Sequence, residues 1–156
     1  MLDTKEFRAA LGRFLSGITV VSTRVGADIH GMTASSFISV SLDPPLVLVA
    51  VNKKARFYQY AQQSGAYGVS ILSAEQQSWS DHFAGKPQAD APPWVEDGFI
   101  TPVLAGSLAV LDCTLESVVE AGDHGLFLGR VQQLRVGEGA PLGYFRGRYL
   151  QNVQNS

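Results

Sequence analysis

The sequence predicts a mainly β domain with flanking helices, built as an antiparallel barrel. One observation is a long hairpin, in which residues 107–121 run out and residues 126–136 run back. Another is that about six or seven strands and three helices lack the strand–helix alternation of a doubly wound sheet. The third is that the strand connections are short, which favours a sheet closed on itself so that few edges stay unpaired.

The chain begins with a short amphipathic helix. Apolar residues recur at helical spacing from Phe7 to Phe14, and Asp3 or Thr4 is a suitable N-cap, so the helix is expected to end near residues 16–17. The β-branched run 18–25 predicts the first strand. A turn at residues 26–28 follows it.

Two strands flank a proline break in the next part. Residues 38–42 alternate between apolar and serine, which predicts a half-buried strand. The prolines at 44 and 45 interrupt the ladder because proline has no N–H to donate. Residues 46–51 are all apolar, so this strand is expected to be buried on both faces.

Two further helices and a long loop lead to the hairpin. A helix over 57–64 is expected to stop at Gly65, and a strand covers 67–72. Ser73 to Gln76 matches a capping box and opens a helix to about Phe83. Residues 85–98 carry three prolines and read as a surface loop, and loops of this length are often functional. In the hairpin, the apolar residues of 107–121 share one strand parity, with Cys113 among them; residues 121–125 form its turn, and 137–139 turn the chain again.

Composition excludes several classes of protein. The chain has 156 residues, a net charge of -2, 46% apolar and only 17% charged residues. This predicts one domain over residues 1–156, with part of its surface covered by a second copy. The acidic balance argues against nucleic-acid binding, and no apolar run is long enough to span a membrane. The start of the chain has no apolar signal core, so a cytoplasmic protein is expected.

Common catalytic motifs are absent from the sequence. It has neither a P-loop, nor a dinucleotide-binding glycine fingerprint, nor a nucleophile elbow. His30, His82 and His124 are dispersed, so no metal centre is predicted. Cys113 is the only cysteine and lies on the apolar parity of its strand, which predicts a buried, inert thiol.

Three segments allow either a functional or a structural reading. Residues 31–37 are small and hydroxylated where a strand normally carries bulk, so they form either a shelf for a flat ligand or a polar strand end. Residues 121–126 form a turn in which His124 either contacts a ligand or is solvated. The basic stretch 52–56 either holds phosphate or is an exposed turn.

The order of these segments resembles that of the flavin reductase-like family of FMN-binding split-barrel proteins. The matching segments are GITVVSTRV, GMTASSFISVSLDPPLVLVAVN, VSIL, HFAG, GDHGLFLGRV and PLGYFRGRY, which cover about residues 5–150. More narrowly, the chain is similar to the small reductase components of two-component flavin-dependent monooxygenases. The resemblance implies a homodimeric, six-stranded antiparallel Greek-key barrel that binds FMN or FAD. It also implies NADH- or NADPH-dependent flavin reduction and a possible separate oxygenase.

The resemblance also implies a set of site residues. The small residues would line the flavin ring and ribityl chain, the basic stretch would face its phosphate, and the helix end would close over it. His124 would position the nicotinamide, and the aromatic C-terminal segment would sit at the mouth. The residues implied are Met32, Thr33, Ala34, Ser35, Ser36, Ala50, Val51, Asn52, Lys53, Arg56, Phe83, Ala84, Gly85, Asp123, His124, Tyr144, Arg146 and Tyr149.

One departure from the family pattern concerns the phosphate. Relatives commonly carry a serine or threonine after the strand that matches 46–51, whereas this chain has Asn52-Lys53-Lys54-Ala55-Arg56. The choice between FMN and FAD therefore stays open. Two alternatives also stay open: a split-barrel flavoprotein that retains its flavin, as an electron carrier or a pyridoxamine-phosphate-oxidase-like enzyme, and a small-molecule-binding barrel without redox chemistry.

Overall fold

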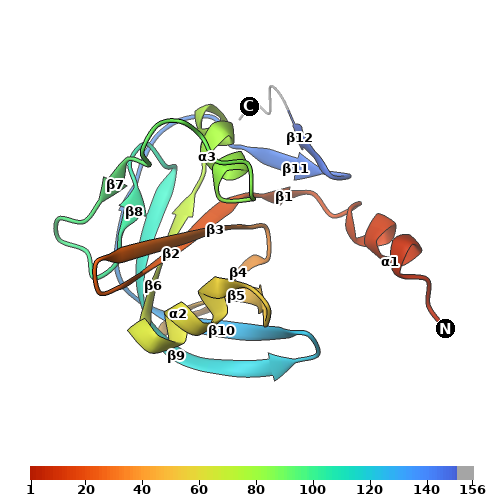
Figure 1. Ribbon diagram of the computed structural model, residues 1–156, viewed down its shortest axis with the longest axis horizontal. Helices are drawn as coiled ribbons and strands as arrows, with labels where there is room; N and C mark the ends of the chain where they lie inside the picture. Colours follow the sequence, from red (N-terminus) through yellow and green to blue (C-terminus); the bar gives the residue numbers. More distant parts are fainter. Residues whose placement is uncertain (151–156) are drawn as a thin grey trace.

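The computed structural model describes residues 1–150, and residues 151–156 of the expected domain lie outside the described part. Figure 1 shows a curled sheet with α2 and α3 against it and α1 projecting to one side. The helical elements are α1 (Thr4–Leu11), α2 (Arg56–Ser64), the 3-10 turn η1 (Ala74–Gln76) and α3 (Gln77–His82). The strands are β1 (Ser16–Gly17), β2 (Thr19–Val25), β3 (Asp28–Ala34), β4 (Phe37–Leu42), β5 (Pro45–Asn52), β6 (Ala66–Ile71), β7 (Trp94–Val95), β8 (Val103–Leu104), β9 (Ala109–Ala121), β10 (His124–Val136), β11 (Gly143–Phe145) and β12 (Arg148–Leu150).

The main sheet is an antiparallel barrel that remains open at one point. Its seven strands follow the order β3-β2-β6-β9-β10-β5-β4. The two outer strands, β3 and β4, are consecutive in the chain and are joined by Ser35 and Ser36 alone. The sheet therefore curls until its edges lie one short connection apart, yet within residues 1–150 no pairing joins β3 to β4. The predicted antiparallel barrel is confirmed, with seven strands in place of the six that the resemblance implies, and Ser35 lies in its split.

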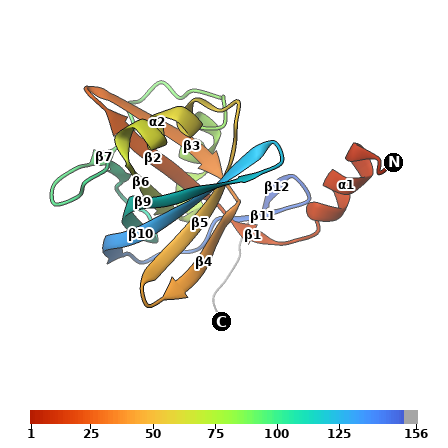
Figure 2. The same ribbon diagram turned by 90° about the horizontal axis from the view of Figure 1, so that it is seen from below.

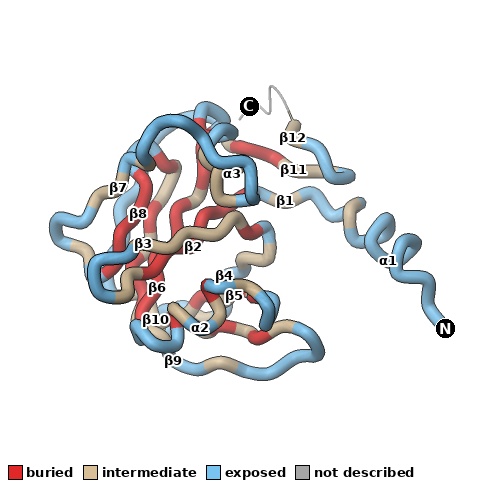
Figure 3. Tube along the Cα trace, in the orientation of Figure 1, coloured by how far each residue is buried: buried red, intermediate tan, exposed pale blue. Residues whose placement is uncertain are grey.

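The core lies inside this curled sheet and is closed by α2. Figure 3 shows the buried stretches gathered on the central strands. The helix buries Phe57 and Ala61. It ends at Gly65, whose left-handed conformation (φ 74°) lets the chain turn back toward β6. Phe57 packs edge-on against Tyr67, with 6.3 Å between ring centroids. The predicted helix stop at Gly65 is correct.

Cys113 lies in this core, as the sequence predicts, and its side chain is inaccessible. Burial, and then the charge of Asp112, raise the pKa of the Cys113 thiol to about 12. Because only the thiolate is nucleophilic, this cysteine is inert at neutral pH.

The expectation that residues 46–51 are buried on both faces is wrong. In β5, Val47, Val49 and Val51 are buried, whereas Leu46 and Leu48 on the other face are only half-buried. The reason is that β5 belongs to a single curled sheet, so one face meets the core and the other points outward. Residues 1–150 therefore leave the apolar outer face of β5 only partly covered.

The expected single parity of the hairpin strand is also wrong, because the strand contains a bulge. Pairing moves from Leu128 with Ser117 to Gly129 with Leu115, so Glu116 is the extra residue. Since successive side chains alternate between faces, one extra residue exchanges the faces beyond it. Val119 is consequently 48% exposed.

The first helix and the hairpin turn are both shorter than expected. The helix ends at Leu11 rather than near residues 16–17, because β1 takes up Ser16 and Gly17 and pairs them with β11. The hairpin turn comprises only Gly122 and Asp123, since His124 already pairs with Ala121. Gly122 has φ 61°, a value that glycine adopts without strain. His124 is therefore the first residue of β10.

The loop after α3 is fixed by a buried carboxylate. Asp112 of β9 is fully buried and accepts hydrogen bonds from Ile100 N (2.5 Å), Thr101 N (3.1 Å) and Thr101 Oγ1 (2.7 Å). The hydroxyl of Ser22 in β2 donates to Pro102 O at 2.5 Å. The segment of loop around residues 100–102 is thus held by side chains of the sheet rather than by its own secondary structure.

Candidate functional site

Two adjoining cavities lie at the split between β3 and β4. The first has a volume of about 550 Å³, within the range of small-molecule sites. The second, of about 190 Å³, shares Ile18 and Ser35 with it. The first is lined by Phe14, Ser16, Gly17, Ile18, Thr19, Ser35, Ser36, Phe37, Ile38 and Ile71. The second is lined by Ile18, Thr33, Ser35, Ser80, Ala84, Tyr144 and Tyr149.

The three hydroxyls predicted to face a ligand differ in their availability. Ser36 Oγ donates to Ala50 O at 2.8 Å and so ties the start of β4 to β5. Thr33 Oγ1 donates to Ser80 O at 2.5 Å. Within residues 1–150 the Ser35 hydroxyl makes no hydrogen bond, and Ser35 is exposed and common to both cavities. Ser35 is therefore the hydroxyl that is available to a ligand.

The end of α3 forms a wall against β3. Thr33 N donates to Phe83 O at 3.3 Å. The Phe83 ring lies so close to Gly31 that a Cβ at this position would be 2.7 Å from it, so any larger residue there would have to displace the ring. Phe83 packs with Trp79 and Trp94 in a second hydrophobic cluster, while Ala84 lines the smaller cavity. Of the residues 83–85 expected to close over the flavin, Ala84 alone lines either cavity.

Two C-terminal tyrosines form the opposite wall. Their rings meet edge-on, with 5.6 Å between the centroids of Tyr144 and Tyr149. Tyr149 OH bonds to Ser80 Oγ and donates to Asp81 Oδ1, both at 2.8 Å. Partial burial raises the pKa of Tyr149, and the Asp81 carboxylate acts in the same direction. This network joins the small sheet of β1, β11 and β12 to α3 across the smaller cavity.

Arg146 lies at the rim of this wall. Its backbone N–H donates to Gly12 O at 2.8 Å, and its φ of 53° places it in the left-handed region. The Arg146 guanidinium lies 5.3 Å from the centroid of the Phe145 ring. A third cavity, of about 470 Å³, is lined by Phe145, Arg146, Arg148, Tyr149 and Leu150. Arg146 and Tyr149 thus line the same cavity.

The hairpin turn brings a second predicted group beside the end of β5. His124 lies opposite Asn52 in the pairing of β10 with β5. Lys53 N donates to Asp123 O at 3.0 Å, and Lys53 Nζ lies 3.4 Å from Glu120 Oε1. His124 Nδ1 is 2.7 Å from Asp123 Oδ1. The hydrogen bond from His124, together with its charge, lowers the pKa of Asp123.

The turn and the split lie at the same end of the sheet. Ala50 N donates to Ser36 O at 3.3 Å, and Asn52 follows two residues later on the same strand. Figures 1 and 2 both show the β9–β10 turn on the side from which β1 and α1 project. The sequence segments around Ser35, Asn52 and His124 therefore converge, although they are far apart in the chain.

The basic stretch starts α2 without a side-chain cap. Asn52 Oδ1 instead accepts from Lys54 N at 2.9 Å, which shapes the turn before the helix. Arg56 is exposed at the first position of α2 and lies near His30. Burial lowers the pKa of His30, and the nearby Arg56 charge lowers it further. Lys53 and Arg56 therefore supply positive charge next to the end of β5.

Comparison with known proteins identifies the family to which this chain belongs. Residues 11–152 match the model of the flavin reductase like domain. The chain belongs to this family. It is 42% identical over 150 residues to the reductase component of 4-hydroxyphenylacetate 3-monooxygenase from Thermus thermophilus, covering 96% of this chain and 97% of that one.

Solved structures of the flavin reductase-like family agree in fold. The flavin reductase PheA2 superposes with a TM-score of 0.93 at 42% identity, covering 98% of this chain and all (100%) of that one. The NADH:FAD oxidoreductase SgcE6 of Streptomyces globisporus, in complex with NAD and FAD fragments, gives 0.90 at 35% identity, covering 100% and 98%. The predicted family and split-barrel fold are thereby confirmed.

The chemistry of the site fits a flavin of the kind this family is named for. Small side chains border a cavity large enough for a flat ring system, and the Ser35 hydroxyl there makes no hydrogen bond within residues 1–150. Cations at Lys53 and Arg56 can hold a phosphate as point charges. The side chains of Ala34 and Val51 face the core instead, so only their backbone groups are left to contact a ligand.

Sequence reasoning missed several residues that line these cavities. Ile18 is common to both, and Ser80, which is fully buried, holds Tyr149 and Thr33 together. Ser80 gave no signal because a serine inside a short helix is usually a surface residue. The only indication in the sequence was that Ser80 lies four residues after Gln76, the last residue of the capping box.

The described residues also bear on metal binding and on membrane insertion. Residues 1–150 contain no cluster of three or more potential metal ligands. No helix among them has both the length and the apolar character needed to cross a bilayer.

Proposed function

We propose that this protein is an NAD(P)H:flavin oxidoreductase that reduces FMN or FAD in the cavity at the barrel split. The observation that carries this proposal is the position of Ser35, which lies exposed between two adjoining cavities and whose hydroxyl makes no hydrogen bond to any of residues 1–150. The family and the relatives named as reductases support the redox chemistry. The relative solved with NAD and FAD fragments supports both cofactors.

The protein's part in such a reaction is to hold two flat rings in contact. A bound flavin supplies the hydride acceptor and the nicotinamide supplies the hydride, so no side-chain nucleophile is needed. Ser35 and nearby backbone N–H groups orient the ring, while Tyr144 and Tyr149 limit the space on one side. Holding the two rings in a fixed orientation lowers the activation free energy by several kcal/mol, on the order of the effect in well-oriented intramolecular reactions.

The test is a comparison of NADH and NADPH oxidation with FMN, FAD and riboflavin as acceptors, followed at the reduced-nicotinamide absorbance band. The proposal expects multiple turnovers with free flavin added. Flavin that stays with the protein through gel filtration and turns over only once without another acceptor would instead indicate an electron carrier. A protein that binds no flavin would be a barrel without redox chemistry.

A histidine at the hairpin turn is expected to contact the nicotinamide. We predict that His124→Ala raises the KM for NADH about tenfold with little change in kcat, because His124 lies beside Asn52 at the same end of the sheet as Ser35. Steady-state kinetics with saturating flavin measure this. His82→Ala is the control for the loss of an imidazole, because His82 lines neither of the two cavities at Ser35. Unchanged KM in the His124 variant would remove the nicotinamide role.

A separate oxygenase is the proposed consumer of the reduced flavin. The proposal rests on the relative named as the reductase component of a monooxygenase. The cavity at Ser35 is open toward solvent, which is consistent with a flavin that leaves after reduction. Reduced flavin generated without oxygen should therefore pass through an ultrafiltration membrane that retains the protein.

We also propose that the protein is a homodimer in which the exposed apolar side chains of β4 are covered. Ile38, Val40 and Leu42 on this strand are 55%, 46% and 96% exposed. The outer face of β5 next to it is apolar and half-buried. A second copy would remove this surface from water, which is the main driving force of association.

The dimer can be tested with one charge. We expect Leu42→Glu to halve the mass measured by light scattering after gel filtration, because a carboxylate would be desolvated in the interface. Its own strand would be unaffected, since Leu42 is almost fully exposed in the single chain. Val119→Glu, an apolar residue 48% exposed on β9, serves as control. A wild-type protein that is monomeric at high concentration would refute the proposal.

A further inference from the structure

A further cavity lies at the opposite end of the hairpin from His124. It has a volume of about 300 Å³ and lies between the loop before β9 and the last residues of β10. None of its lining residues is shared with the cavities at Ser35. Arg135 and His124 are separated by most of the 13-residue strand β10, roughly 35 Å at the usual rise per residue. This cavity is therefore independent of the proposed flavin site.

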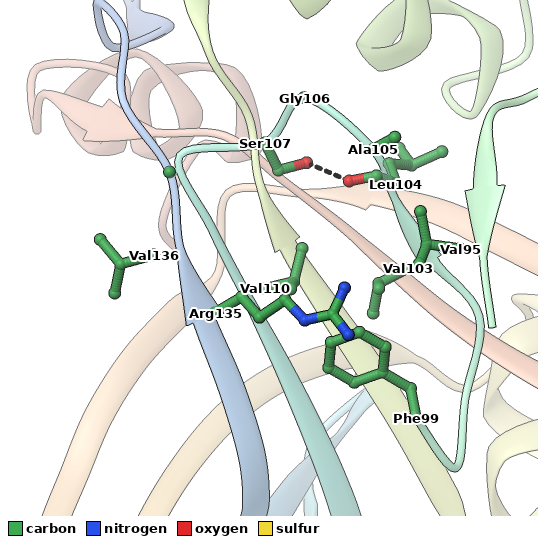
Figure 4. A pocket seen from close by; sticks show the side chains of 11 residues that line it. Val95, Phe99, Val103, Leu104, Ala105, Gly106, Ser107, Val110, Arg135 and Val136 are labelled. Carbon is green, nitrogen blue, oxygen red and sulfur yellow. Dashed lines mark hydrogen bonds between the residues drawn. The ribbon is translucent and has the colours of Figure 1, made fainter. Parts of the chain in front are cut away.

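The side chains that line the cavity are apolar except for those of Arg135 and Ser107, and the Ser107 hydroxyl already donates to Leu104 O. Val95, Val103, Val110 and Val136 contribute branched aliphatic surface. Figure 4 shows the Arg135 side chain reaching across the cavity toward the ring of Phe99. The guanidinium carbon lies 4.5 Å from the centroid of that ring, and Nη2 donates to Asp97 O at 3.3 Å. Most of the guanidinium N–H groups are left without a partner among residues 1–150.

The cavity wall is held in place before any ligand arrives. Leu104 N donates to Ser70 Oγ and Gln76 Nε2 donates to Ala105 O, both at 2.9 Å. Asp112 fixes Ile100 and Thr101 immediately before this segment. A preformed wall of this kind lowers the ordering cost of binding.

We propose that this cavity binds a small monocarboxylate with an apolar body about the size of one ring. A planar guanidinium with free N–H groups matches the two oxygens of a carboxylate. The valine walls and the Phe99 ring would cover the apolar body, and the volume lies at the lower end of ligand cavities. Among residues 1–150, Arg135 is the only charged residue that lines the cavity.

The experiment compares benzoate with benzamide, which has the same shape without the charge. Saturation-transfer NMR on the full chain, with and without excess FMN, should show benzoate binding with a Kd of about 1 mM and benzamide at least roughly tenfold weaker. Arg135→Gln should abolish this difference. Arg130→Gln is the matched control, because Arg130 lies on the same strand and is paired with Glu116 outside the cavity.

A second variant protects the test from a folding defect. Val136 is 78% exposed, so Val136→Glu should leave the melting temperature unchanged while its charge at the rim expels benzoate. Equal binding of benzoate and benzamide, binding that survives Arg135→Gln, or competition by FMN would overturn the proposal. A change of oligomeric state in Val136→Glu without loss of benzoate binding would show a protein contact instead. None of these outcomes depends on flavin reduction.

Discussion

Ser35→Trp is expected to weaken flavin binding by roughly 100-fold. Ser35 is shared by both cavities at the barrel split, so an indole there would occupy the space that a flavin ring needs. Because Ser35 is exposed and its hydroxyl bonds to no residue in the described part of the chain, the fold should tolerate the larger side chain. The affinity is measured by titrating the protein into flavin and following the loss of flavin fluorescence.

The control for this variant is Ser64→Trp, which adds the same indole at an exposed position on the last turn of α2. Ser64 lines neither cavity, so wild-type affinity is expected. A Ser35→Trp protein that melts like wild type and still binds flavin with unchanged affinity would place the flavin elsewhere. The same result would remove the main support for the proposed reductase site.

Asp112→Ala is expected to cost about 3 kcal/mol of unfolding free energy, a large part of the stability of a typical domain. The substitution leaves Ile100 N and the Thr101 donors without their acceptor in a buried region. The loop from residue 97 to residue 102 would lose its attachment to β9. A fall of about 10 °C in melting temperature is expected for a chain of this size.

Two other variants separate the hydrogen bonds from the mere loss of a charge. Asp112→Asn keeps the shape but turns an acceptor into a donor that faces N–H groups, so it should also destabilise. Asp90→Ala removes an exposed carboxylate of the long loop and should change the unfolding free energy by less than about 0.5 kcal/mol. Chemical denaturation of all three proteins measures this. An Asp112→Ala protein as stable as Asp90→Ala would show that the loop is held by other contacts.

Local patterns predicted most elements because each depends on nearby residues. The capping box of Ser73 and Gln76 is present, with Ser73 N donating to Gln76 Oε1 at 2.9 Å. Glycine at 65 ends α2 in the left-handed conformation that a glycine stop requires. These features are encoded within a few residues, so one sequence is sufficient to find them.

The errors came from relations between distant segments. The bulge at Glu116 is defined only by the partner strand β10, and the burial of β5 depends on which face of a single sheet meets the core. The hydrogen bonds of Tyr149 with Ser80 and Asp81 join residues that are 69 and 68 positions apart in the sequence. No local pattern therefore indicates this network. The small residues 33–36 were found because such residues are unusual for a strand. Their hydrogen bonds, which distinguish Ser35 from Ser36, could not be predicted from the sequence.

The opening between β3 and β4 has a consequence for how the protein responds to heat. Within residues 1–150 no backbone ladder joins β3 to β4, so this seam is the place where the barrel can come apart most easily. A ligand bound in the seam stabilises the folded state, because the unfolded chain has no site that binds it. Thermal resistance should then climb with the logarithm of flavin concentration, and amide protons bordering the seam should exchange more slowly as flavin is added.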